Sequence, residues 1–249
     1  MHTPQTVNAL SNTYSWYCKR NIDNLQPDLA GEFGFINNYD ALWLNTSRND
    51  NDNNRIAYLT FDAGYENGNI ARILDVLKKK EVKGAFFILE NLINSNPELV
   101  LRMQREGHLV CNHTAHHKDM SKIVNIDAFA EELSALESSY QNLTGCEISH
   151  FYRPPEGRFS EENLKFAESL GYCTVFWSFA YADWDNNKQP SKEYAIKKVL
   201  DNMHNGAVLL LHPTSATNAT ILGTIIDEMR NNGYEFGTLE ELKKELSQN

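Results

Sequence analysis

The chain of 249 residues lacks several features that would define its class at once. No stretch approaches the roughly 18 consecutive apolar residues of a membrane-spanning helix, so we expect no transmembrane segment. Its four cysteines show no C-x-x-C spacing, which argues against a disulfide framework and favours buried apolar thiols. Positive charge is also scarce, and the net charge of −10 argues against a nucleic-acid partner because phosphate backbones repel an acidic surface.

Two sequence patterns are missing as well. The first residues, Met-His-Thr-Pro-Gln-Thr, have no signal-peptide pattern. No G-x-G-x-x-G follows the first strand-like run, which argues against a dinucleotide-binding sheet. What remains is a globular composition with 41% hydrophobic residues, and the length fits one large α/β domain or two small ones.

The chain divides into two regions. Residues 1–54 are rich in Asn, Asp and aromatic residues and show little periodicity, whereas residues 55–249 alternate between strand-like and helix-like patterns. Strand-type apolar runs occur at 56–61, 84–89, 108–112, 150–152, 174–179, 207–211 and 234–238. Helical patterns occur at about 68–80, 96–106, 127–143, 160–170, 191–204, 219–231 and 239–247. This alternation predicts an α/β fold, a distorted (β/α) barrel of about seven parallel strands, with residues 1–54 as an N-terminal extension that packs on it.

Five residues of chemical interest follow the carboxyl ends of predicted strands. They are Asp62, His113, Arg153, Asp183 and His212. Barrel enzymes build their active sites at that face. The sequence therefore predicts that distant segments assemble one site there.

Paired histidines indicate a metal site. His113 and His117 are four residues apart, so a helical turn after the strand would place both imidazoles on one face, where they could share a divalent ion. Imidazole favours zinc and similar ions. His116 pairs less well with His113 by spacing. The alternative is a polar loop with ordinary histidines.

Other side chains in these segments have both functional and structural interpretations. Asp62 could be a base, a metal ligand or a helix cap. Arg153 could clamp a carboxylate bidentately and keep it ionised, and His212 could donate a proton near neutral pH. Trp177 and Trp184 could stack on a sugar, with core packing as the alternative that is stronger for Trp177.

Taken together, five segments resemble the motifs of NodB-type polysaccharide deacetylases, carbohydrate esterase family 4. They are Thr60-Phe61-Asp62-Ala63, His113-Thr114-Ala115-His116-His117, Arg153 to Gly157, Asp183-Trp184 and Leu210-Leu211-His212. The resemblance spans roughly residues 55–240 and implies a hydrolase that removes an N-acetyl group from a polysaccharide.

The resemblance implies four catalytic residues. Asp62 is the expected general base and His212 the expected general acid. Arg153 would orient Asp62, and Asp183 would tune His212. The resemblance also implies two substrate contacts, made by the backbone N–H of Glu156 to the oxyanion and by Leu210 in the acetate pocket. Trp184, which could stack on a sugar, is the third expected substrate contact.

The resemblance further implies a divalent metal ion on His113 and His117. Zinc is the preferred ion, with cobalt and manganese as alternatives, and no other cofactor is expected. The family's second Asp, a metal ligand, is Ala63 here, which leaves two protein ligands where catalytic zinc usually has three. We therefore expect weak binding, which Ala63→Asp would tighten.

Residues 60–68, with Ser15-Trp16 and Tyr39-Asp40-Ala41, resemble a narrower branch, the muramic-acid deacetylases that act before δ-lactam formation in spore-cortex peptidoglycan. The preferred substrate is N-acetylmuramic acid in a peptidoglycan glycan strand; N-acetylglucosamine or chitin is the alternative. The resemblance implies an extracytoplasmic or cell-envelope location, and we expect a monomer.

Two other functions stay open. One is a catalytically weak barrel that binds glycan, which the missing ligand at Ala63 suggests. The other is a glycosidase that uses Asp62 and Asp183 as its two carboxylates. A glycosidase would leave the paired histidines without a role.

Overall fold

A computed structural model describes residues 12–20 and 23–248. The expectation that the chain lacks a signal peptide concerns residues 1–6, which lie outside this part of the chain. Within the described residues, no helix is both long and apolar enough to cross a membrane.

The central element is a curled sheet in which every neighbouring pair of strands is parallel. Its strands are β2 (Ala41–Leu42), β3 (Arg55–Ala63), β4 (Ala85–Ile88), β5 (Leu109–Asn112), β6 (Ser149–Tyr152), β8 (Cys173–Val175), β9 (Ala207–Leu211) and β10 (Tyr234–Gly237). The order is β10-β3-β4-β5-β6-β8-β2, with β9 also paired to β3. All but the short β2 were predicted, so the α/β barrel of about seven parallel strands is confirmed.

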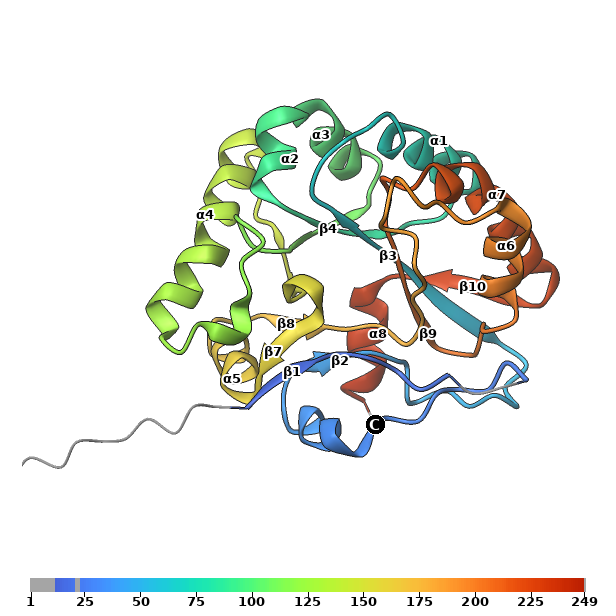
Figure 1. Ribbon diagram of the computed structural model, residues 1–249, viewed down its shortest axis with the longest axis horizontal. Helices are drawn as coiled ribbons and strands as arrows, with labels where there is room; N and C mark the ends of the chain where they lie inside the picture. Colours follow the sequence, from blue (N-terminus) through green and yellow to red (C-terminus); the bar gives the residue numbers. More distant parts are fainter. Residues whose placement is uncertain (1–11, 21–22, 249) are drawn as a thin grey trace, which may run out of the picture.

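The predicted helices are present as well, and all but the C-terminal one cover the outside of the sheet (Figure 1). They are α1 (Ile70–Lys80), α3 (Pro97–Arg105), α4 (Ile126–Thr144), α5 (Glu161–Ser169), α6 (Lys192–Leu200), α7 (Ala216–Asn231) and α8 (Leu239–Leu246). Only the short α2 (Glu90–Ser95) was not predicted; three 3₁₀ turns, η1 (Gly31–Asn38), η2 (Met120–Lys122) and η3 (Pro155–Gly157), lie in loops. Ser160 and Ser191 cap α5 and α6 with their side chains, as helix-start patterns predict.

Strand β3 positions the site because its side chains point alternately to the outer and the inner face of the sheet. Leu59 and Phe61 face an outer apolar cluster shared with α1 and α7, whereas Tyr58 belongs to an inner cluster that α8 closes with Leu242. Because successive side chains point to opposite faces of a sheet, Asp62 lies on the inner face with Tyr58. The strand therefore delivers a carboxylate into the barrel interior at its carboxyl end.

The predicted strand at 174–179 is shorter than expected. Strand β8 ends at Val175, and the chain then crosses to β9, where the Ser178 N–H donates to the Val208 carbonyl at 3.0 Å and the Leu210 N–H donates to the Phe179 carbonyl at 2.8 Å. An apolar run does not show where a strand changes partners. This crossing directs residues 180–184 toward the end of β9.

The N-terminal region is built into the barrel. Strand β1 (Thr13–Ser15) pairs antiparallel with β7 (Arg158–Ser160), and β2 pairs with β8. Trp16 stacks on Phe176 with ring centroids 4.4 Å apart, and its backbone N–H donates to the Gly157 carbonyl at 2.8 Å. In Figure 1 this blue segment lies along one edge of the molecule. A division of the chain at residues 54 and 55 stays a prediction.

All four cysteines lie in the described part and are free thiols. Cys111 and Cys173 are buried, as expected. Cys18 is only half-buried and Cys146 is exposed, so the prediction of buried thiols is wrong for Cys146. Cys146 lies just after the end of α4, where apolar spacing gives no information on burial.

We expect Gly206→Ala to destabilise the protein more than Gly233→Ala. Both glycines have a left-handed backbone, with φ of +75° and +81°. A Cβ on Gly206 would lie 2.7 Å from the Asn45 carbonyl oxygen, whereas no atom of the described residues comes within 4 Å of a Cβ on Gly233. Gly233→Ala should cost about 1 kcal/mol in free energy of unfolding and Gly206→Ala about 2–3 kcal/mol. Urea denaturation measures both; equal losses would contradict a tight contact at Asn45.

Candidate active site

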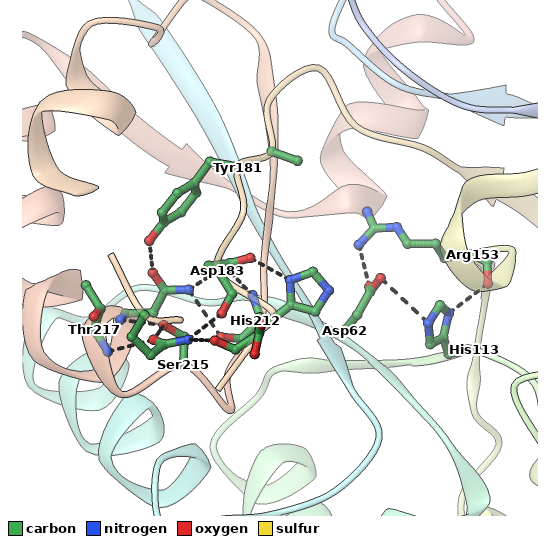
Figure 2. Close-up of polar contacts among 12 residues, drawn as sticks. Asp62, His113, Arg153, Tyr181, Asp183, His212, Ser215 and Thr217 are labelled. Carbon is green, nitrogen blue, oxygen red and sulfur yellow. Dashed lines mark hydrogen bonds and ion pairs between the residues drawn. The ribbon is translucent and has the colours of Figure 1, made fainter. Parts of the chain in front are cut away.

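A cavity of about 900 Å³ opens at the carboxyl ends of the barrel strands. Seven of the nine predicted site residues line it: Asp62, His113, His117, Glu156, Trp184, Leu210 and His212. The other two, Arg153 and Asp183, are fully buried and bond to Asp62 and His212 from behind (Figure 2). The distant segments thus form one site, as predicted.

Asp62 is held by Arg153. The Arg153 Nη1 donates to Asp62 Oδ1 at 2.8 Å. Burial alone would raise the pKa of Asp62, but the charge of Arg153 holds it below its usual value. Asp62 is therefore an ionised carboxylate at neutral pH, with Oδ2 3.6 Å from His113 Nε2.

Arg153 makes one hydrogen bond to Asp62, so the predicted bidentate clamp is wrong. Its Nη2 donates to Thr60 Oγ1 at 2.9 Å and to the Phe176 carbonyl at 3.1 Å, and its Nε donates to the Val175 carbonyl at 3.0 Å. The guanidinium lies over the Phe87 ring at 4.1 Å. The other donors are used to fix the arginine, which in turn fixes the carboxylate.

The two histidines meet through a loop. Their rings are 5.2 Å apart, but the predicted helical turn is wrong, because Thr114 and His117 have left-handed φ of 73° and 56°. His113 Nδ1 lies 2.8 Å from the Arg153 carbonyl, which only accepts, so Nδ1 carries the hydrogen and Nε2 keeps its lone pair. Burial lowers the pKa of His113 to about 4, so the ring is neutral at pH 7.

Glu132 on α4 holds this loop in place. Its backbone carbonyl accepts from the Ala115 N–H at 3.0 Å, and its Oε1 lies 3.0 Å from His116 Nδ1 and 2.6 Å from Lys118 Nζ. His116 is therefore turned away from the cavity, in agreement with its weaker ranking as a ligand.

The two imidazoles supply donors of the kind that a divalent ion binds. A neutral imidazole with an oriented Nε2 is a good metal ligand. Within residues 12–20 and 23–248, however, no group of three or more His, Cys, Asp or Glu side chains is arranged to hold a metal. Ala63 is fully buried in the outer apolar cluster and does not line the cavity, so its methyl faces away from the two imidazoles.

His212 is held by Asp183. Asp183 Oδ1 lies 2.7 Å from His212 Nδ1, and Oδ2 accepts from the His212 backbone N–H at 2.8 Å. Burial alone would lower the pKa of His212, but the Asp183 carboxylate raises it above its usual value. Because Nδ1 donates to the carboxylate, Nε2 is left to exchange a proton on the cavity side.

The sheet sets the spacing between Asp62 and His212. In the parallel pair of β3 and β9, Phe61 lies opposite Leu211, and each is followed directly by one of the two residues. Their side chains face each other across the cavity floor in Figure 2. Asp183 lies behind His212 and outside the cavity, so it cannot flank a glycosidic bond as the glycosidase hypothesis requires.

The three residues predicted to contact substrate line the cavity. Glu156 has a left-handed φ of 56°, and its exposed side chain turns to Arg158, with Oε2 3.1 Å from Nε. Leu210 is buried on the floor, while Trp184 is 62% exposed at the mouth. Trp177, for which the sequence favours core packing, is half-buried; it packs against the core cluster of Trp16 and Phe176 and also lines the cavity.

A polar network behind His212 was not predicted from the sequence. Gln189, Ser215 and Asn218 bond to one another or to the Asp183 segment, and Tyr181 bonds to Asn218. The only available signal was Ser215 three residues before Asn218, a helix-start pattern that does not by itself indicate a site.

Comparisons with known proteins agree with this geometry. Residues 49–175 match the family model described as polysaccharide deacetylase. The peptidoglycan-N-acetylmuramic acid deacetylase PdaA of Bacillus subtilis is 38% identical over 229 residues, 92% of this chain and 85% of that protein. The peptidoglycan-N-acetylglucosamine deacetylase of Bacillus cereus is 34% identical over 188 residues, 74% of this chain and 66% of that protein.

Solved structures show the same relationship. The structure of B. subtilis PdaA, a family 4 carbohydrate esterase, aligns with a TM-score of 0.87 over 94% of this chain and 97% of that one. A family 4 carbohydrate esterase from Bacillus anthracis aligns with a TM-score of 0.75 at 33% identity, over 94% of this chain and 97% of that one. The chain therefore belongs to the polysaccharide deacetylase family, carbohydrate esterase family 4, and is related to its muramic acid deacetylases.

Proposed function

We propose that this protein hydrolyses the N-acetyl group of N-acetylmuramic acid in a peptidoglycan glycan strand, ahead of muramic δ-lactam formation. One observation carries the proposal: a carboxylate and an imidazole face the same cavity, and each is held by a buried partner of opposite charge. The similarity to PdaA over 92% of this chain favours muramic acid. Deacetylation of N-acetylglucosamine or chitin is the alternative substrate class.

Asp62 acts as the general base. It takes a proton from a water molecule as the water oxygen attacks the acetyl carbonyl carbon. Arg153 keeps Asp62 ionised and fixes Oδ1, so Oδ2 is the oxygen that faces the water. The backbone N–H of Glu156, in its left-handed turn on the cavity wall, donates to the developing oxyanion.

His212 acts as the general acid. Its raised pKa keeps Nε2 protonated near neutral pH, and this proton passes to the sugar nitrogen as the C–N bond breaks. The products are acetate and a free amine. Leu210 lines the acetate pocket, and the exposed ring of Trp184 stacks on the glycan.

The two imidazoles of His113 and His117 would hold a divalent ion, zinc before cobalt or manganese. When bound, the ion polarises the acetyl carbonyl and lowers the pKa of water. The neutral state and fixed tautomer of His113 fit this role. We further propose that the enzyme works as a monomer, at the cell envelope where peptidoglycan lies.

Mass spectrometry of muropeptides after incubation with the enzyme tests the proposed function. A loss of one acetyl group on muramic acid is the expected product. Loss on glucosamine would support the alternative substrate. New reducing ends without acetate would indicate a glycosidase, and unchanged muropeptides that still bind the protein would indicate a glycan-binding barrel.

We expect Asp62→Asn to reduce kcat for acetate release by about 10²- to 10⁴-fold, because an amide cannot accept the proton. Since Asp62 and Arg153 are paired at 2.8 Å, folding should be checked by thermal unfolding. Asp75→Asn, which breaks an exposed ion pair with Arg102, is the matched control and should leave kcat unchanged. Near-wild-type acetate release by a folded Asp62→Asn protein would refute the base assignment.

We expect His113→Ala and His117→Ala each to abolish zinc binding in a calorimetric titration and to lose most activity. His116→Ala is the control on the same loop, because its ring faces Glu132 and not the cavity. Ala63→Asp should not tighten binding, since that position faces the apolar cluster. Equal zinc affinity in all four variants would place the metal elsewhere.

We expect Asp183→Asn to move the alkaline limb of the pH–activity profile to lower pH. The Asp183 carboxylate raises the pKa of His212, so its removal lets the general acid deprotonate at a lower pH. The acidic limb, which reports Asp62, should stay near its wild-type position. An unchanged alkaline limb would show that another group is the acid.

A further inference from the structure

We propose that Asn218, on the first turn of α7, is a positioning residue that holds the Asp183 carboxylate against His212. This inference rests on the proposed function, in which His212 is the general acid. Asn218 belongs to none of the five sequence motifs. It is 1% exposed and lies behind the cavity wall.

Asn218 completes the hydrogen bonding of a buried charge. Its Nδ2 donates to Asp183 Oδ2 at 2.6 Å and to the His212 carbonyl at 3.1 Å. Asp183 Oδ2 otherwise accepts only from the His212 N–H among the hydrogen bonds that the described residues form. One side chain thus binds both members of the acid pair, and it turns the carboxylate so that Oδ1 faces the His212 ring.

Tyr181 fixes the orientation of the amide. The Asp183 carboxylate only accepts, so the NH₂ group of Asn218 must face it and the amide oxygen must face the Tyr181 hydroxyl. Burial and the Asp183 charge raise the pKa of Tyr181, so its hydroxyl keeps its proton and donates to Asn218 Oδ1. The chain of donors runs in one direction, from Tyr181 through Asn218 to Asp183.

A second helix of the same protein shows that this arrangement is not forced by the helix start. Asn163 and Asn218 occupy the same place, three residues after the capping serines Ser160 and Ser215. Asn163 closes a capping box by accepting from the Ser160 N–H at 3.0 Å. Asn218 turns its side chain to Tyr181 and Asp183 instead. In α7, the Asn218 side chain therefore binds Asp183 and His212 and does not form the helix-capping hydrogen bond that Asn163 forms in α5.

The loop that carries Asp183 is tied to the same helix start. Ser215 accepts from the Asn218 N–H at 3.0 Å and donates to Gln189 Oε1 at 2.5 Å, and Gln189 Nε2 donates to the Asp183 carbonyl at 2.9 Å. Backbone and side chain of Asp183 are therefore both fixed to α7. Figure 2 shows Ser215 beside Asp183 and His212.

Three charged groups act on the pKa of His212, and Asn218 contacts one of them, Asp183. They are Asp183 behind the ring and Asp62 and Arg153 across the cavity. Without Asn218, the carboxylate loses a donor that fixes its rotation, and its bond to His212 Nδ1 weakens. The pKa of His212 then falls, in the same direction as in Asp183→Asn.

The test compares Asn218→Ala with Asn163→Ala, its match in the capping pattern, by NMR titration of the His212 ring and by kinetics. We expect Asn218→Ala to lower the pKa of His212 and to reduce kcat about tenfold at unchanged KM, a part of the 10²- to 10⁴-fold of a general acid. Asn163→Ala should change neither. In an Asp183→Asn background, Asn218→Ala should have almost no further effect, because it acts through Asp183.

Tyr181→Phe provides a milder variant if Asn218→Ala does not fold, and it should shift the pKa of His212 in the same direction by less. An unchanged pKa in the folded variant, or losses that add independently in the double mutant, would overturn the proposal. The titration needs no turnover. A wild-type enzyme that releases no acetate would refute the proposed function, while a pKa shift in Asn218→Ala would still support the positioning role.

Discussion

The site depends on one buried cation. Arg153 is fully buried, yet it contacts Asp62 and Thr60 on β3 and the carbonyls of Val175 and Phe176 beside β8. A buried charge is tolerated only when it is paired and hydrogen-bonded, and these partners supply both conditions. Since its own carbonyl also orients His113, the same residue fixes the carboxylate and the tautomer of the imidazole beside it.

Much of this arrangement could be predicted from sequence. Alternation of apolar runs with helical patterns identified seven strands, and the position of Asp62, His113, Arg153 and His212 after strand ends brought them to one face. These features depend on local periodicity and on the parallel topology that follows from it.

The features that could not be predicted depend on contacts between residues that lie far apart in the sequence. The loop at 113–117 bends through left-handed residues because Glu132, on a helix further along the chain, binds its backbone and side chains. Asn218 and Asn163 occupy the same position in a helix-start pattern. Only the folded structure shows that the Asn163 side chain caps its helix, whereas the Asn218 side chain binds Asp183. Likewise, the motif at 60–63 does not show which face of the sheet Ala63 occupies. The alternation of side chains along β3 places Ala63 in the outer apolar cluster.

The base and the acid come from adjacent, hydrogen-bonded strands at the same register, so the backbone spacing of a sheet, about 4.8 Å, determines how far apart they start. The walls around them come from loops, and the N-terminal segment supports one of these loops through the hydrogen bond of Trp16 to Gly157. Reaction geometry and substrate choice are therefore built from different parts of the chain. Loops in this architecture can diverge toward new glycans while the distance over which a proton must travel stays the same.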